Sequence, residues 1–342
     1  MIKNVLIKKK YIDVFFVLII SVLASYIGST RNVFQTDSDD LIRYYASYLE
    51  LSRGLVLDRE VVFQLFNYFI YKNFGDITPQ TYLFLVTLPK NILFCILLTK
   101  LRRDNSDFGY LIAALCVLFP LNILVGTQLI RQQFAIILFI YGYLFCGLRR
   151  SLLITVFASS IHTLVIPFFI VTFSVEKYLG FYDKSIVKKQ LLLFVLVALS
   201  PLYFTVLIKI LSFTPEFQSR LGFLSGMSAN YTFGSIFLFV IFVNIAYVLS
   251  CYRWVNVIGY RLYVTITVFF LVFIFSMPYE ALIGRFSNFA FIFLPYIFMC
   301  VCKYLRFLQI GYILVVAIVA ILYVIQLMFS DPDFSFFINN YL

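Results

Sequence analysis

Apolar runs long enough to cross a membrane recur along almost the whole chain. Each is close to the ~20 residues that span a hydrocarbon core, and they lie at about 11–28, 80–99, 108–125, 131–147, 191–211, 234–252, 262–278, 286–302 and 311–329. Hydrophobic residues make up 63% of the 342 residues and charged residues only 13%, which leaves too little polar surface to cover a soluble globule. The sequence therefore predicts a single integral membrane domain over residues 1–342. The fold is expected to be all-α and polytopic, with about 9–11 transmembrane helices.

Two segments do not fit a simple series of spans. Residues 61–73 are too short and too amphipathic to cross the bilayer, which favours a helix lying in the interface. Residues 151–176 are long enough to cross once, but Ser159, Ser160, His162 and Pro167 interrupt their middle. A re-entrant hairpin with His162 near its tip is the alternative to a single crossing.

Positive charge separates these two possibilities. The net charge of +11 is explained by basic cytoplasmic loops and anionic lipid rather than by nucleic acid, because no basic cluster is interleaved with aromatics on a polar surface. With the N-terminal lysines inside, the hairpin places 17 of the 27 Lys and Arg residues on cytoplasmic ends. A single crossing would invert every later loop. The positive-inside rule thus predicts a cytoplasmic N-terminus, an outer loop over 29–80 with amphipathic segments, and a second outer loop over 212–233.

Several polar residues stand where this topology does not expect them. Arg131 and Arg285 begin apolar runs at the outer boundary, Asn288 shares a helix face with Arg285, and His162 approaches the same level from the hairpin. Lys90 lies near the middle of its run, where a cation is costly unless it faces a partner or a cavity. One interpretation is a cationic pocket for an anionic lipid headgroup such as a diphosphate, because guanidinium groups pair with two phosphate oxygens. The other is that these side chains snorkel or pair with outer carboxylates.

Further candidates lie in the outer loops and at span ends. Asp37, Asp40 and Glu60 could deprotonate a sugar hydroxyl, or could cap helices and pair with arginines. Gln132, Arg31 and Arg220 are candidate substrate-binding residues. With one histidine and no outer cysteine, the common zinc constellations do not occur, and neither does a Walker A loop, a dinucleotide fingerprint or a Gly-x-Ser-x-Gly elbow. No metal or other cofactor is expected.

The order of these polar islands resembles a known family. The islands are TDSDDLIRYY (36–45), REVVFQLFNYF (59–69), IRQQFA (130–135), ASSIHT (158–163) and GRFSNF (284–289). They are similar to those of bacterial polysaccharide polymerases of the O-antigen polymerase (Wzy) type, in particular its EpsG-like branch. Gln35 stands where that branch commonly has a glycine, and either Asp37 or Asp40 could be the matching acid.

The resemblance implies a GT-C-like, metal-independent glycosyltransferase of the bacterial inner membrane. It would polymerise undecaprenyl-diphosphate-linked repeat units on the periplasmic face. Its catalytic residues would be Arg131, His162, Arg285 and one of the two aspartates. The partners implied are the lipid-linked glycan donor and acceptor, the bilayer, and a polysaccharide chain-length regulator. A flippase for the same lipid-linked sugars, an O-antigen ligase and a membrane acyltransferase are the alternatives.

Overall fold

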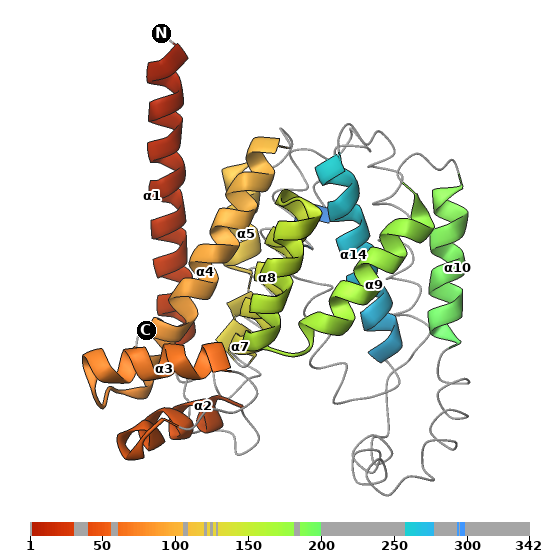
Figure 1. Ribbon diagram of the computed structural model, residues 1–342. Coiled ribbons are helices and arrows are strands. Elements are labelled where there is room, and N and C mark those ends of the chain that lie inside the picture. The colour runs from red at the N-terminus through yellow and green to blue at the C-terminus, as the bar shows by residue number, and fades with distance from the viewer. Residues whose placement is uncertain are drawn as a thin grey trace, which may run out of the picture. The chain divides into compact units, whose positions relative to one another are not determined.

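The computed structural model describes residues 2–30, 40–55, 61–104, 109–119, 122–123, 126–127, 129–180, 185–199, 257–276, 293 and 295–297. Every regular element within these ranges is a helix, which confirms the predicted all-α class (Figure 1). In the described part of the chain, three helices are long and apolar enough to cross a membrane: α1 (Ile2–Ser29) over Tyr11–Ser29, α4 (Pro79–Asp104) over Pro79–Arg102, and α14 (Val257–Ser276) over Val257–Phe275. The protein is therefore a polytopic helical membrane protein. The remaining predicted spans at 234–252, 286–302 and 311–329 and the loop at 212–233 lie outside the described residues or almost entirely so.

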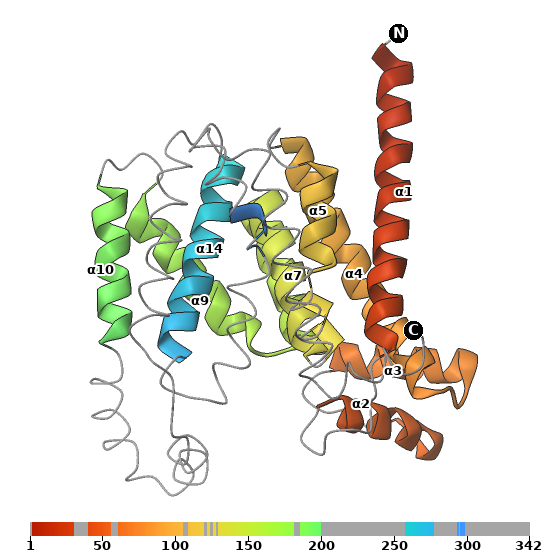
Figure 2. The same cartoon turned by 180° about the vertical axis from the view of Figure 1, so that it is seen from behind.

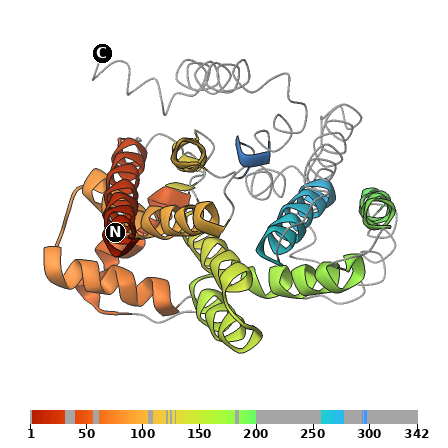
Figure 3. The same cartoon turned by 90° about the horizontal axis from the view of Figure 1, so that it is seen from above.

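The described residues divide into two compact units between Phe169 and Ile170, and the helix that contains this boundary contributes to both. In the first unit, α1 packs lengthwise against α4 and touches α5 (Tyr110–Val117), as the view along α1 shows (Figure 3). Small side chains make the close approach possible: Ser21, Ala24 and Ser25 of α1 are all buried. A Cβ on Gly28 would lie only 2.9 Å from Cγ2 of Thr127. A stripe of small residues thus seats α1 against its neighbours.

Two short helices, α2 (Asp40–Leu49) and α3 (Val61–Phe74), lie across the end of α4 that begins at Pro79 (Figures 1 and 2). A single turn of 3-10 helix, η1 (Glu50–Arg53), follows α2. Tyrosines attach α2: the Tyr45 hydroxyl donates to the Ile77 carbonyl at 2.7 Å, and the Tyr48 hydroxyl donates to the Gly75 carbonyl. Burial, with a smaller contribution from Asp76, raises the pKa of Tyr48 to about 12, so its hydroxyl remains a donor at physiological pH.

The α3 helix carries apolar side chains on two faces, one of which also holds a buried asparagine. Phe63, Asn67 and Ile70 are buried against the protein, while Leu65 is 45% and Phe69 62% exposed on the other face. A helix of this kind, lying across the ends of membrane-spanning helices, fits the membrane interface. The structure thus confirms the helix expected over 61–73, and its place at the outer surface stays a prediction.

The run at 108–125 is not one continuous helix. Its first helix, α5, has eight residues and ends at Val117, after which Leu118 and Phe119 are not helical. Pro120 explains the interruption, because proline disfavours helical geometry at the residue before it. The sequence interpretation of 108–125 as a single span is corrected accordingly.

Residues 148–179 form two helices with a bend between them, and the re-entrant course expected over 151–176 stays a prediction. Helix α7 (Ile130–Phe145) packs against α8 (Leu148–Ile161), and a Cβ on Gly142 would lie 2.9 Å from Ile154. The chain then bends at His162 and continues as α9 (Val165–Leu179) (Figure 1). The Phe169 ring near the start of α9 returns to Phe139 in the middle of α7, with centroids 6.3 Å apart. Helices of 14 and 15 residues measure only about 21 Å and 22 Å, shorter than the ~30 Å core.

Polar contacts connect the helices of the second unit. Gln190 of α10 (Ile186–Ala198) accepts from the Tyr263 hydroxyl at 2.6 Å and donates to Thr267 at 3.3 Å, both on α14. Arg261 of α14 forms an ion pair with Glu176 of α9 at 3.2 Å. Such pairs satisfy polar groups that the bilayer could not solvate.

Candidate functional site

Arg131 is the second residue of α7, at the point where α7 meets the two short helices. Its guanidinium carbon lies 4.5 Å from the ring centroid of Tyr44 of α2 and 5.7 Å from that of Phe63 of α3. Both rings are nearly fully buried, with 7% and 4% exposure, and their centroids are 5.8 Å apart. A guanidinium over two aromatic faces is stabilised by cation–π attraction. The outer segments therefore hold Arg131 in a fixed position.

Lys90 lies deeper in the same unit and is 1% exposed. Its ammonium donates to the amide oxygen of Gln133 at 3.2 Å. Gln133 stands two residues after Arg131 on α7, so this bond joins the middle of α4 to the Arg131 helix. Gly126 closes the other side, because a Cβ there would lie 2.0 Å from Nζ of Lys90 and 2.7 Å from Oε1 of Gln133. The Lys90 ammonium is thus enclosed, with an amide oxygen as its partner.

The residues around Lys90 are unusually polar for a membrane-spanning helix. Asn91 donates to the Ser25 hydroxyl of α1 at 2.9 Å, and its own side-chain oxygen is buried with no hydrogen-bond partner among the described residues. Pro89 stands inside α4, where its ring removes the amide that would bond the Leu85 carbonyl. Buried polar groups of this density in a membrane segment are the usual mark of a functional region.

His162 caps the C-terminal end of α8 in an extended conformation, with φ −154° and ψ 123°. Its Nδ1 accepts a hydrogen bond from the Leu164 amide at 3.2 Å. A ring nitrogen that accepts a bond carries no proton, so this contact favours the tautomer with the proton on Nε2. His162 is then a hydrogen-bond donor through Nε2 rather than a proton acceptor. Helix α3 packs against α8, the helix that ends at His162.

The structure places some of the other predicted site residues and not others. Asp40 is the first residue of α2, and Gln132 is buried on α7 beside Arg131. Six candidates lie outside the described residues: Arg31, Asp37, Glu60, Arg220, Arg285 and Asn288. Their roles, like those of Arg131, His162, Lys90 and Gln132, stay predictions.

Three residues at this site were not singled out from the sequence. Tyr44 and Phe63 form the aromatic seat of Arg131, and Gln133 holds Lys90. The two aromatics stand in the outer amphipathic segments, whose clustering of rings was the available indication. Gln133 follows Gln132 directly on α7, and neighbouring side chains on a helix point about 100° apart, so the rotation of α7 decides which of the two faces α4.

The arrangement offers cations and hydrogen-bond donors rather than metal ligands. Within the described ranges, no group of three or more His, Cys, Asp or Glu side chains could hold a metal ion. Arg131 at a helix start and a donating His162 at a helix end are suited to an anion with several oxygens. Such groups stabilise negative charge that develops on a leaving group.

The fold and this site define a polytopic, all-helical membrane protein that carries an aromatic-seated arginine at the start of one helix. The chain belongs to the EpsG family, whose family model matches residues 5–342. That match confirms the family resemblance seen in the sequence. Neither the curated proteins nor the solved structures that were searched gave a match. The EpsG family is associated with glycosyltransferase-like polymerases, so this is a membrane protein of polysaccharide biosynthesis.

Proposed function

We propose that this protein polymerises oligosaccharide repeat units carried on undecaprenyl diphosphate, at the periplasmic face of a bacterial inner membrane and without a metal ion. The growing glycan is transferred from its lipid carrier to the non-reducing end of a newly delivered repeat unit. A hydroxyl oxygen of the acceptor bonds to the anomeric carbon of the donor as the bond to the diphosphate oxygen breaks. The lipid diphosphate leaves with the bonding electron pair, and the hydroxyl proton passes to a base.

The observation that carries this proposal is the position of Arg131. Its guanidinium is held over Tyr44 and Phe63 where α2 and α3 cover the start of α7. A leaving diphosphate gains negative charge as the glycosidic bond breaks, and a cation fixed in advance stabilises that charge without reorganising. Because α3 exposes Leu65 and Phe69 on its outer face, a lipid carrier in the outer leaflet would lie next to this helix.

His162 supports the same reaction as a donor. With Nδ1 bonded to the Leu164 amide, its Nε2–H can donate to a phosphate oxygen in the neutral ring. A protonated ring would lose the Leu164 contact, so we assign His162 to stabilising the leaving group. The base then falls to an outer carboxylate, for which Asp37, Asp40 and Glu60 are the candidates.

Arg285 is proposed as a second cation for the diphosphate, with Asn288 beside it, and Arg31, Arg220 and Gln132 as further contacts to the substrate. Two arginines suit a diphosphate because each guanidinium can bridge two oxygens. A chain-length regulator remains a proposed partner, and an O-antigen ligase would use the same donor with a different acceptor.

A flippase needs charged groups along a path through the membrane, and Lys90, near the middle of its apolar run, is the candidate for such a group. In the structure, Lys90 is enclosed by Gln133 and Gly126 and is 1% exposed. An ammonium enclosed in this way does not line an open path. Lys90 instead fits a role in setting the position of α7, and hence of Arg131.

The polysaccharide ladder of a deletion strain tests the proposal. A single capped repeat per core indicates that polymerisation is lost, whereas a bare core with repeats stranded on the carrier indicates a ligase or a flippase. Complementation with Arg131→Ala or Arg285→Ala should leave the protein in the membrane and abolish the polymer. The corresponding lysine variants keep the charge but not the forked geometry, so they should restore only part of the ladder. Normal polymer from Arg131→Ala would remove Arg131 from the site.

A further inference from the structure

The middle of α1 and the end of α4 remote from Arg131 border an open cavity with a volume of about 620 Å³. One wall is apolar and comes from Val14 and Leu18 of α1 and Ile96 of α4. The other is polar and comes from Thr99 and Lys100 of α4 and Tyr141 of α7. The proposed reaction uses none of these residues.

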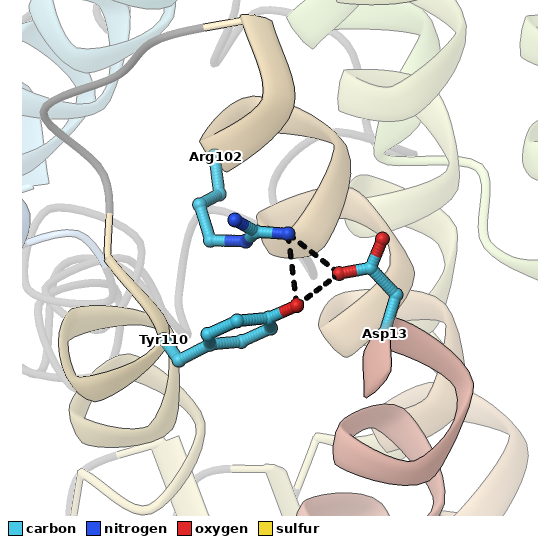
Figure 4. A network of polar contacts seen from close by, with 3 residues as sticks. All are labelled: Asp13, Arg102 and Tyr110. Carbon is cyan, nitrogen blue, oxygen red and sulfur yellow. Dashed lines mark hydrogen bonds and ion pairs between the residues drawn. The ribbon is translucent and has the colours of Figure 1, made fainter. Parts of the chain in front are cut away.

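A polar network that includes the lining residue Asp13 lies beside this cavity, and Figure 4 shows its three side chains. Asp13, which also lines the cavity, accepts from Arg102 Nη2 at 2.6 Å and from the Tyr110 hydroxyl. Arg102 also donates to the Tyr110 hydroxyl at 2.9 Å. The carboxylate is 3% exposed and its charge is matched by the guanidinium. The network therefore adds little net charge to the cavity.

Lys100 is the cation that remains, since it forms no ion pair with a carboxylate among the described residues. Its Nζ lies 4.9 Å from the ring centroid of Tyr141 and 4.4 Å from that of Phe145, and it donates to the Tyr141 hydroxyl at 3.4 Å. These contacts with α7 hold the ammonium at the cavity without neutralising it.

Thr99 supplies a second polar group. Thr99 is 5% exposed, and its hydroxyl oxygen is buried without a hydrogen-bond partner within the described part of the chain. A threonine in a helix commonly satisfies its hydroxyl on the carbonyl one turn earlier. At Thr99 that bond is not made, so the wall beside Lys100 holds an unsatisfied hydroxyl just below its surface.

The depth of the cavity indicates what kind of molecule fits. Asp13 lies two residues inside the span Tyr11–Ser29, and Lys100 lies two residues before the end of Pro79–Arg102. The polar end is thus at the level of the membrane surface. Val14, Leu18 and Ile96 are 50%, 51% and 40% exposed, so the apolar wall faces the hydrocarbon region. A charged end at headgroup level and an apolar wall below it match a phospholipid.

We propose that this cavity is a binding site for one anionic phospholipid. Its phosphodiester contacts the Lys100 ammonium, and the first part of an acyl chain lies along Val14, Leu18 and Ile96. The site is separate from the glycan chemistry, so it stands whether or not the protein is a polymerase. Through this site, one lipid of that leaflet contacts α1, α4 and α7.

Native mass spectrometry of the purified full-length protein in detergent tests this, with phosphatidylglycerol and phosphatidylcholine as the probes. The wild type should retain one phosphatidylglycerol in preference to phosphatidylcholine. Lys100→Met should weaken phosphatidylglycerol binding about fivefold, the effect of one lysine at an anionic lipid surface. Lys72→Met is the matched control, because Lys72 also lies over a tyrosine ring, 5.4 Å from the centroid of Tyr68, but on α3. It should bind as the wild type does.

Two more variants keep the test decisive if Lys100→Met does not fold. Lys100→Arg should keep the preference for the anionic lipid, and Ile96→Trp should fill the apolar wall and reduce retention of both lipids. Equal affinity for the two lipids in the wild type, unchanged binding by Lys100→Met, or full binding by Ile96→Trp would each overturn the proposal. Displacement of the lipid by inorganic phosphate at about 10 mM would also overturn the proposal, because the site would then recognise free phosphate.

Discussion

Gly126→Ala is a small change with a large expected effect on stability. The added methyl would lie 2.0 Å from the Lys90 ammonium and 2.7 Å from the Gln133 amide oxygen, so the bond between them could not persist. A hydrogen bond to a charged group contributes about 1.5–3 kcal/mol. Moving packed atoms aside costs about 1 kcal/mol or more in addition. We therefore expect the free energy of unfolding to fall by about 3 kcal/mol.

Thermal unfolding in detergent measures this effect. Cys95 and Cys116 are buried free thiols, so a thiol-reactive dye reports their exposure as the protein unfolds. For a unit of this size, about 3 kcal/mol corresponds to a midpoint lower by roughly 6–12 °C. Gly109→Ala is the control, because a Cβ at Gly109 would meet nothing within 4 Å and its φ is −81°.

A double variant identifies the cause. In Lys90→Met the ammonium is absent, so adding Gly126→Ala should cost at least about 1 kcal/mol less than in the wild type. An equal cost in both backgrounds would show that the contact with Lys90 does not matter. A midpoint for Gly126→Ala equal to that of Gly109→Ala would refute the reasoning altogether.

Three further outcomes are expected. His162→Gln keeps a donor near the position of Nε2, whereas His162→Asn keeps only the acceptor for the Leu164 amide. In a ladder assay, His162→Gln should therefore leave more polymerising activity. The opposite order would mean that His162 acts as a helix cap. Tyr44→Leu removes one ring under Arg131 and should lower polymerising activity about twofold to thirtyfold. Tyr44→Phe keeps the ring and should stay near the wild type, and equal loss in both variants would contradict the cation–π role. A reporter fused after Lys189 should be cytoplasmic and one near Ser225 periplasmic, and the reverse at both sites would rule out the hairpin topology.

The membrane class and the bend at His162 could be predicted from the sequence. Long apolar runs indicate α1, α4 and α14 because burial in lipid requires them. The polar residues around His162 indicated a bend where the structure has one. These features depend on local composition, which a single sequence displays directly.

The contacts of the site could not be predicted in the same way. Whether Gln132 or Gln133 meets Lys90 depends on the rotation of α7 against α4, and the seat of Arg131 depends on how α2 and α3 fold over it. The early end of α5 agrees with Pro120 in the sequence, whereas the apolar run around that proline predicts an unbroken span. In the sequence, Asp13 is an acidic residue within an apolar run. Its partners Arg102 and Tyr110 are far away along the chain, so their contacts with Asp13 could not be predicted.

We propose that Arg131 stabilises a departing lipid diphosphate in a polymerisation that needs no metal ion. The most direct test reconstitutes the purified protein in liposomes with a lipid-diphosphate-linked repeat unit, a metal chelator and no nucleotide. We predict polymer and released lipid diphosphate from the wild type, reduced amounts from Arg131→Lys, and almost none from Arg131→Ala in protein that is folded and inserted. Polymer from Arg131→Ala at the rate of the wild type, or its loss from the wild type on chelation alone, would contradict the account.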